Sequence, residues 1–109
     1  MEQGEYQEAI SYLEKASSMN PRDVEARLLL GRALAGAERF TEARDELHRA
    51  AELSPSNPDV HLELSRVYLR LGDPARSREA ADRFRQFRRE ADSAQSDLPT
   101  SLGFEDAQP

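Results

Sequence analysis

Two histidines and a set of arginines at helical spacing are the side chains of this sequence best placed to do chemistry. His48 and Glu52 are four residues apart, so on a helix they would share a face and could offer two ligands to one metal ion. The simpler interpretation is a surface histidine beside a surface glutamate, because His61, the other histidine, falls on a different segment and cysteine is absent. The five glycines never cluster into a phosphate-binding loop. We therefore expect no catalytic residue, no cofactor and no metal, and we do not expect an enzyme.

The arginines require a separate test for nucleic-acid binding. Residues 54–89 contain eight arginines and only five acids, so this range is basic. Arg78, Arg85 and Arg89 share one stripe of an expected helix. A nucleic-acid site would leave such a stripe unopposed and would add aromatic side chains for stacking on single strands. Asp82 lies on the same stripe, one turn from Arg78 and from Arg85, and can pair with both. Nucleic-acid binding is therefore the less favoured alternative to a solvated helix end.

The elements that must position these residues follow from an internal repeat. A shift of 34 residues aligns the chain with itself and pairs apolar positions that are three, four and seven apart, which is helical spacing. The identical pairs include Glu8 with Glu42, Ala9 with Ala43, Leu13 with Leu47, Ala16 with Ala50, and Pro21 with Pro55. Glycines and prolines fall between the helical stretches, so the sequence predicts an all-α chain of short helical units.

Turn residues divide the chain into five expected helices. Asn20-Pro21 and Asn57-Pro58 each stop one helix and start the next, and Gly72-Asp73-Pro74 does so more strongly. The expected helices cover residues 4–19, 23–36, 40–53, 58–71 and 74–92. Because the turns between them are short, successive helices are expected to be antiparallel neighbours.

Three stretches carry a resemblance to a known family. GEYQEAISYLEKASSMNP and ERFTEARDELHRAAELSP resemble the second helix of a tetratricopeptide repeat, and VEARLLLGRALAGA resembles the first, with Leu30-Gly31 as its Leu-Gly pair. PDVHLELSRVYLRLGD keeps Leu64 and Tyr68 but has Ser65 in place of the glycine. The resemblance implies a right-handed α-solenoid of antiparallel helix pairs with two and a half repeats. It places the second helix of repeat one at 4–19, repeat two at 23–53 and repeat three at 58–92, all within a helical domain of residues 1–92. After about residue 93 the chain has no period and little apolar content, so its composition predicts a disordered acidic tail at 93–109.

The resemblance also implies a working surface, because the first helices of this family line a concave groove that binds a peptide or helix of another protein. By position, the groove residues here are Leu28, Leu29, Arg32, Asp59, Leu62, Glu63, Arg66 and Arg70. The arginines could hold carboxylates by bidentate pairing, with the leucines as apolar anchors. Members that clamp chaperone tails need asparagine where Leu29 stands, and Lys and Arg where Asp59 and Glu63 stand, so no such clamp is expected.

The first helix carries apolar surface that its counterpart one repeat later lacks. Tyr6, Ile10 and Tyr12 belong to an apolar face that covers about half of the helix circumference. Two interpretations remain open. The chain is the C-terminal capping piece of a longer array whose upstream repeats are missing here, or this edge packs against a second copy or a partner.

The chain has 109 residues, of which 33% are charged, and a formal net charge of −6. This length suits one domain of ordinary size. No apolar run approaches the roughly 18 residues that suggest a membrane span, and no basic-then-apolar leader opens the chain, so we expect a cytoplasmic protein without membrane contact. The excess of acids lies in residues 1–21 and 90–109, whereas residues 54–89 are basic.

Overall fold

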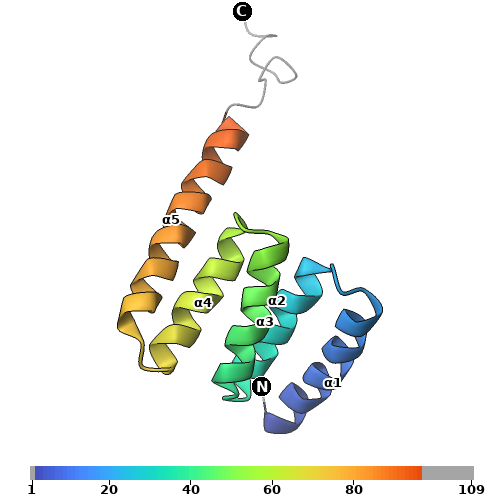
Figure 1. The fold of residues 1–109 in the computed structure, drawn as a ribbon. Coiled ribbons are helices and arrows are strands. Elements are labelled where there is room, and N and C mark those ends of the chain that lie inside the picture. Colours follow the sequence, from blue (N-terminus) through green and yellow to red (C-terminus); the bar gives the residue numbers. More distant parts are fainter. Residues whose placement is uncertain (1, 97–109) are drawn as a thin grey trace, which may run out of the picture.

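The computed structural model describes residues 2–96, and all of its regular elements are helices. They are α1 (Gln3–Met19), α2 (Val24–Gly36), α3 (Phe40–Leu53), α4 (Pro58–Arg70) and α5 (Pro74–Ser96). Figure 1 shows them side by side in a row, with α1 at one end and α5 at the other. Within the described part of the chain, the expected all-α class and the order of five helices are confirmed.

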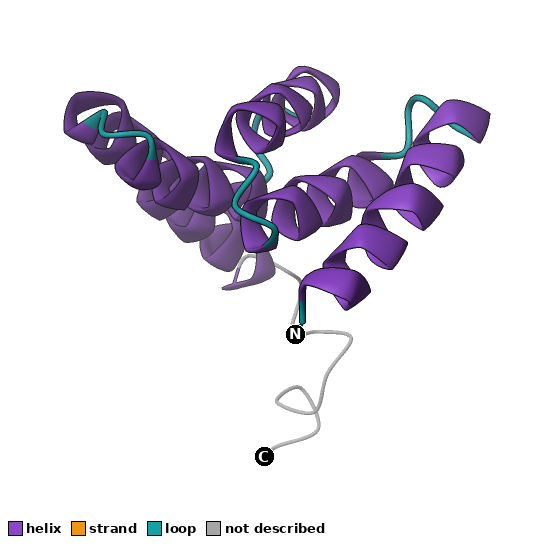
Figure 2. Ribbon diagram, turned by 90° about the horizontal axis from the view of Figure 1, so that it is seen from below, coloured by secondary structure: helices purple, strands orange, loops and turns teal. Residues whose placement is uncertain are grey.

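The helices form a solenoid of antiparallel pairs. Each helix packs against the next one along the chain, and α2 also contacts α4 directly. The molecule is elongated, with dimensions of 58 × 33 × 26 Å. Figure 2 shows the same arrangement from below, where the helices follow one another without a strand in the part described. Contacts confined to near neighbours are the defining property of a repeat architecture.

Side-chain caps explain where three of the helices begin. The Asp23 carboxylate accepts from the backbone N–H of Ala26 at 3.1 Å, and Asn57 accepts from the N–H of Asp59 at 3.0 Å. The Asp73 carboxylate likewise accepts from the N–H of residue 76 at 3.1 Å. These side chains satisfy backbone donors that the first turn of a helix leaves without partners. The helices therefore begin within one residue of the positions that the turn residues predict.

The last helix is longer than the sequence pattern suggests. The expected end was residue 92, but α5 continues to Ser96 and extends past the end of α4 (Figure 1). No glycine or proline interrupts residues 75–96, so each further residue adds a backbone hydrogen bond. The first four residues of the expected tail at 93–109 are therefore helical, and residues 97–109 lie outside the described part of the chain.

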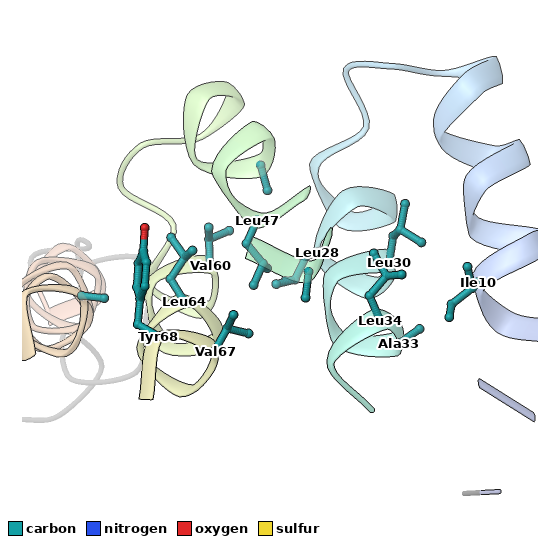
Figure 3. Close-up of a cluster of buried hydrophobic side chains, with 13 residues drawn as sticks. Ile10, Leu28, Leu30, Ala33, Leu34, Leu47, Val60, Leu64, Val67 and Tyr68 are labelled. Atoms are coloured by element: carbon teal, nitrogen blue, oxygen red, sulfur yellow. The ribbon is translucent and has the colours of Figure 1, made fainter. Parts of the chain in front are cut away.

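Buried apolar side chains form one continuous row through the stack. Figure 3 shows this row, which runs from Ile10 on α1 to Tyr68 on α4, and the same cluster includes Ala80 on α5. Helix α3 contributes its centre, because Ala43, Leu47 and Ala50 are each 0% exposed. Two of these residues are alanines, which let the neighbouring helix backbones approach α3 closely.

The turns after α2 and α4 each contain one residue in the left-handed backbone conformation, and these two residues are 34 positions apart. Gly72 has φ of 79°, whereas Glu38 has φ of 65° and is the one non-glycine residue with positive φ among those described. A left-handed conformation costs an L-residue roughly 1–2 kcal/mol, and glycine avoids this cost. Glu38 is therefore a strained position in the second repeat.

Replacing Glu38 with glycine is expected to stabilise the fold by about 0.5–1 kcal/mol. The net gain is smaller than the full strain because glycine is more flexible in the unfolded chain. Among the described residues, Glu38 has one ion pair, a 3.8 Å contact with Arg70 between exposed side chains, so its loss costs little. Thermal unfolding followed by circular dichroism should show Tm rising by about 2–8 °C. Glu38→Gln, which removes the charge but keeps the strain, should leave Tm nearly unchanged, and an equal rise in both variants would contradict the strain argument.

Candidate functional site

Side chains of α2 and α4 form one candidate surface, which we call the α2–α4 face. It consists of Leu29 and Arg32 on α2 and of Asp59, Leu62, Glu63, Arg66, Leu69 and Arg70 on α4. Leu29 is 38% exposed and Leu69 is 63% exposed, so two large apolar side chains lie beside the charged ones. Exposed leucines among arginines are typical of a surface that binds another protein.

The carboxylate of Glu63 joins the two halves of the α2–α4 face. Its Oε1 accepts from Nε of Arg32 at 3.1 Å and from a terminal nitrogen of Arg66 at 3.0 Å. The Glu63 side chain is only 10% exposed, whereas those of Arg32 and Arg66 are 42% and 65% exposed. Each guanidinium has five N–H donors and commits one nitrogen to this carboxylate, so both keep donors for the carboxylates of a partner.

Arg70 marks the far end of the α2–α4 face. Its guanidinium carbon lies 4.7 Å from the centre of the Phe40 ring, which is cation–π geometry. Its side chain is 60% exposed and lies 3.8 Å from the carboxylate of Glu38. The aromatic ring therefore holds this third arginine in place and leaves most of its side chain at the surface.

Two of the residues that the sequence places at a surface are buried instead. Leu28 is 2% exposed and lies beside Leu47 in the row of core side chains, so it does not line the α2–α4 face (Figure 3). Ile10 is 1% exposed and belongs to the same core as Leu30 and Leu34, so it is not part of an exposed edge. Both side chains lie on the sides of their helices that pack against a neighbouring helix of the chain.

A cavity of about 250 Å³ lies at the N-terminal edge of the molecule, between α1 and α2. We call it the α1–α2 cavity, and its lining is Tyr6, Ala9, Leu13, Leu29, Arg32 and Ala33. Five of these six side chains are apolar or aromatic. Sequence reasoning placed Tyr6 at this edge but missed the cavity itself. One signal in the sequence could have indicated it. Ala9 and Leu13 are the counterparts, one repeat earlier, of Ala43 and Leu47, and α2 covers those two later residues. No described helix covers Ala9 and Leu13 in the same way.

Tyr6 and Tyr12 differ sharply in their surroundings. A Cβ atom at Gly36 would lie 2.1 Å from Cε1 of Tyr6, so the glycine creates the space in which the Tyr6 ring packs. Tyr12 is 73% exposed and lies outside the lining of the cavity. The structure therefore brings Tyr6 together with Ala9 and Leu13 and leaves Tyr12 on the open surface of α1.

The two histidines have structural partners in this fold. Nε2 of His48 lies 2.6 Å from the hydroxyl of Tyr68, and Nε2 of His61 lies 2.7 Å from the carbonyl oxygen of Pro55. Burial lowers the pKa of His48 below its ordinary value, and the positive charge of Arg44 adds to this. Among the described residues, no group of three or more His, Cys, Asp or Glu side chains is placed to hold a metal ion.

Three arginines of α5 pair with acids of the same helix. Asp82 accepts from Arg85, the side chain of Arg83 lies 3.1 Å from Glu79, and Arg88 lies 3.6 Å from the carboxylate of residue 92. Of the expected stripe, Arg85 has such a pair. The expected second pair, of Asp82 with Arg78, does not form in the described part of the chain. In the part of the chain that the structure describes, no helix is both long and apolar enough to cross a membrane.

Antiparallel helix pairs that repeat every 34 residues and touch only near neighbours define the class of α-solenoid repeat proteins. Two models of known families, both described as tetratricopeptide repeat, match residues 1–58 and residues 34–98. The chain belongs to the tetratricopeptide-repeat family. Membership supports a role as a protein-interaction scaffold.

Relatives and solved structures agree with this family. A TPR repeat-containing thioredoxin of Arabidopsis thaliana, TTL4, is 35% identical over 75 residues, which are 69% of this chain and 11% of that protein. MamA from Desulfovibrio magneticus RS-1 has a TM-score of 0.75 at 26% identity, over 79% of this chain and 49% of that one. The type III secretion translocator chaperone SycD of Yersinia enterocolitica has a TM-score of 0.74 at 15% identity, over 77% and 64%, a likeness of fold alone. The chain thus spans 11% of the curated relative and about half of MamA.

Proposed function

We propose that this protein is a non-catalytic interaction module that binds a peptide or helix of another protein on the α2–α4 face. The observation that carries the proposal is the Arg32–Glu63–Arg66 cluster beside the exposed side chains of Leu29 and Leu69. One carboxylate orients two guanidinium groups in advance. Such pre-orientation lowers the entropic cost of binding.

The mechanism is surface complementarity without a chemical step. Leu29, Leu62 and Leu69 supply the apolar contact area, and the arginines select the orientation of the bound segment. Three arginines share the face with two acids, Asp59 and Glu63, and the carboxylate of Glu63 is already engaged by two of the arginines. The expected partner segment therefore carries acidic side chains next to apolar ones.

A structural role is the second candidate, and the α1–α2 cavity is the observation that favours it. In this alternative the chain caps a longer repeat array, or forms a homodimer through its N-terminal edge. Nucleic-acid binding by α5 is disfavoured by the ion pairs of Arg83, Arg85 and Arg88 with neighbouring acids. If the protein does not bind labelled DNA or RNA even at low salt, nucleic-acid binding is rejected.

Reversing two charges on the α2–α4 face is expected to abolish partner capture. The variant carries Arg66→Glu and Arg70→Glu, whose wild-type side chains are 65% and 60% exposed, so the fold should survive. Loss of two charge-assisted hydrogen bonds, each worth about 1.5–3 kcal/mol, should weaken binding at least tenfold. The measurement is affinity capture from lysate of the source cells, with quantitative mass spectrometry of the retained proteins.

The matched control carries Arg85→Glu and Arg89→Glu on the outer side of α5, which is the same change of charge at exposed positions. The proposal expects this control to retain the same proteins as the wild type. Circular dichroism checks that both variants stay helical. An unchanged set of captured proteins with the Arg66/Arg70 variant would reject the α2–α4 face as the binding site.

A further inference from the structure

We propose that the cavity between α3, α4 and α5 binds a carboxylate group, in the place that the Glu46 carboxylate takes one repeat earlier. We call it the α3–α5 cavity, and its volume is about 150 Å³. Its polar lining consists of His48, His61, Tyr68, Arg76, Glu79 and Arg83. Pockets for drug-sized ligands have about 300–1,000 Å³, so this one suits a carboxylate on a short carbon chain. The inference does not depend on the α2–α4 face, because none of the residues of that face lines this cavity.

The α3–α5 cavity has a counterpart 34 residues earlier, between α1, α2 and α3. In that earlier cavity the Glu46 carboxylate lies 2.8 Å from Arg27 and also pairs with Arg49. The positions of these three residues are held in the later cavity by Ala80, His61 and Arg83, respectively. The later cavity has therefore lost the acceptor and has kept a nitrogen-bearing side chain at the position of each donor.

His61 repeats one of the two contacts that Arg27 makes. Nε of Arg27 donates to the carbonyl oxygen of Pro21 at 3.3 Å. Nε2 of His61 lies 2.7 Å from the carbonyl oxygen of Pro55, one repeat later, and donates to it because a carbonyl oxygen only accepts. Arg27 uses a second nitrogen for Glu46, whereas Nδ1 of His61 is buried without a hydrogen-bond partner among the described residues. A carboxylate would accept from this nitrogen of the protonated ring, as Glu46 accepts from Arg27.

The charge around the α3–α5 cavity favours an anion. Its lining contains one acid, Glu79, whose carboxylate already lies 3.1 Å from Arg83. Arg76 lies 3.2 Å from the carboxylate of Asp73. The side chains of Arg76 and Arg83 are 68% and 54% exposed, and each guanidinium keeps further N–H donors for a ligand. Two arginines and two histidines thus share this lining with a single acid, whereas in the earlier cavity two glutamates face two arginines.

His48 and Tyr68 complete the polar lining as a hydrogen-bonded pair. Nε2 of His48 lies 2.6 Å from the Tyr68 hydroxyl, and Figure 3 shows Tyr68 at the α5 end of the row of core side chains. His48 stands at the position of Glu14, the other acid of the earlier cavity. Both acids of the earlier cavity are therefore absent from the later one, and the ligand supplies the negative charge.

The carboxylate comes either from a small organic acid or from an acidic side chain of another protein, and two probes distinguish these sources. Acetate represents the free acid, and the α-amide of N-acetyl-glutamate represents the side chain. NMR of the histidine ring protons, at an ionic strength held constant with chloride, should show saturable shifts at His48 and His61 by about 100 mM probe. The α-amide of N-acetyl-glutamine has the same shape without the charge, and it should not bind.

Saturable binding of either probe supports a carboxylate site, and the tighter of the two identifies the source. Inorganic phosphate is the competing anion. Tighter binding of phosphate than of both carboxylates, or no saturable shift with either carboxylate, would overturn the proposal.

Acetate should bind at least threefold more tightly at pH 6 than at pH 8, because the contact with Nδ1 requires the protonated ring of His61. The other titratable or charged groups that line the cavity are His48 on α3, Tyr68 on α4, and Arg76, Glu79 and Arg83 on α5. Of these, His48 is the group whose ordinary pKa lies near this range, and it also gains positive charge at the lower pH. An affinity that stays constant or rises with pH would contradict the site.

Variants of the two exposed arginines locate the site without disturbing the core. Arg76→Gln and Arg83→Gln should each weaken acetate binding at least threefold. Arg85→Gln is the matched control on α5 outside the cavity, and it should change binding less than twofold. The variant with Arg66→Glu and Arg70→Glu should bind acetate like the wild type, so the loss of one binding surface is distinguishable from the loss of the other.

Returning a carboxylate to the chain itself gives the last test. In Ala80→Glu the new carboxylate should pair with Arg83, as Glu46 pairs with Arg49, and it should abolish acetate binding. Its Tm should exceed that of the uncharged variant Ala80→Gln by at least about 2 °C. If Ala80→Glu is poorly folded, the arginine variants decide. Acetate binding that persists in a folded Ala80→Glu variant, or that is unchanged in both Arg76→Gln and Arg83→Gln, would overturn the proposal.

Discussion

Replacing Gly31 with leucine is expected to lower the free energy of unfolding by about 2 kcal/mol. An added Cβ alone would lie 2.7 Å from the Cγ and Cδ2 atoms of Leu47, and a leucine adds three more carbons in the same direction. Leu47 is 0% exposed at the centre of the core, so it has no free space into which to move. Overpacking of this kind costs about 1–3 kcal/mol and sometimes more, while the better helix propensity of leucine returns up to about 1 kcal/mol.

Urea unfolding followed by circular dichroism measures this effect, and the expected loss is a large part of a typical stability of about 5–15 kcal/mol. Gly4→Leu is the matched control, because Gly4 is also in a helix but has no atom within 4 Å of an added Cβ. It should leave the stability unchanged or slightly higher. Equal stability of Gly31→Leu and the wild type would show that α2 does not pack on α3 as described.

Removing Glu46 is expected to cost about 2–3 kcal/mol. Its carboxylate lies 2.8 Å from Arg27 across the α2–α3 interface, and the two side chains are only 13% and 16% exposed. Glu46→Ala would leave the Arg27 guanidinium mostly buried with one remaining acceptor, the carbonyl oxygen of Pro21 at 3.3 Å. Breaking a buried ion pair from one side typically costs 3–5 kcal/mol, and partial exposure reduces this figure.

A double substitution tests whether the loss comes from the charge that is left without its partner. The combined change Arg27→Leu and Glu46→Leu should recover most of the lost stability, because two apolar side chains need no partner. The control is Glu42→Ala, which removes a pair with Arg39 between side chains that are 55% and 34% exposed, and its cost should stay below about 1 kcal/mol. Similar losses from Glu46→Ala and Glu42→Ala would mean that the interfacial pair is solvated.

Most of the fold could be predicted because its determinants are local. The 34-residue period aligns Ala9 with Ala43 and Leu13 with Leu47, and turn residues separate the helices. Cap residues such as Asp23 then set the helix starts to within a residue. The left-handed residue after α2 was harder to predict. The helix ends at Gly36 as expected, but the positive φ falls on Glu38, the counterpart of Gly72.

The candidate site was only partly predictable, because periodicity orders residues around a helix without showing which neighbour covers each side. Leu28 and Leu29 are adjacent and equally apolar, yet one is 2% and the other 38% exposed. Helix α3 packs on the side of α2 that carries Leu28, so Leu28 is buried and Leu29 stays partly exposed. Ile10 was expected at the edge because Arg44 is its counterpart, but it packs into the core instead. The cluster around Glu63 forms because α2 approaches α4. The spacing of residues within one helix does not show which other helix comes close to it.

The affinity of one captured protein for three versions of this chain tests the central claim most directly. Isothermal titration calorimetry would compare the wild type, the Arg66→Glu/Arg70→Glu variant and the Arg85→Glu/Arg89→Glu control. Binding on the α2–α4 face predicts a Kd at least tenfold higher for the Arg66/Arg70 variant and an unchanged Kd for the control. A Kd that stays the same for the Arg66/Arg70 variant, or rises only for the α5 control, would contradict binding on this face.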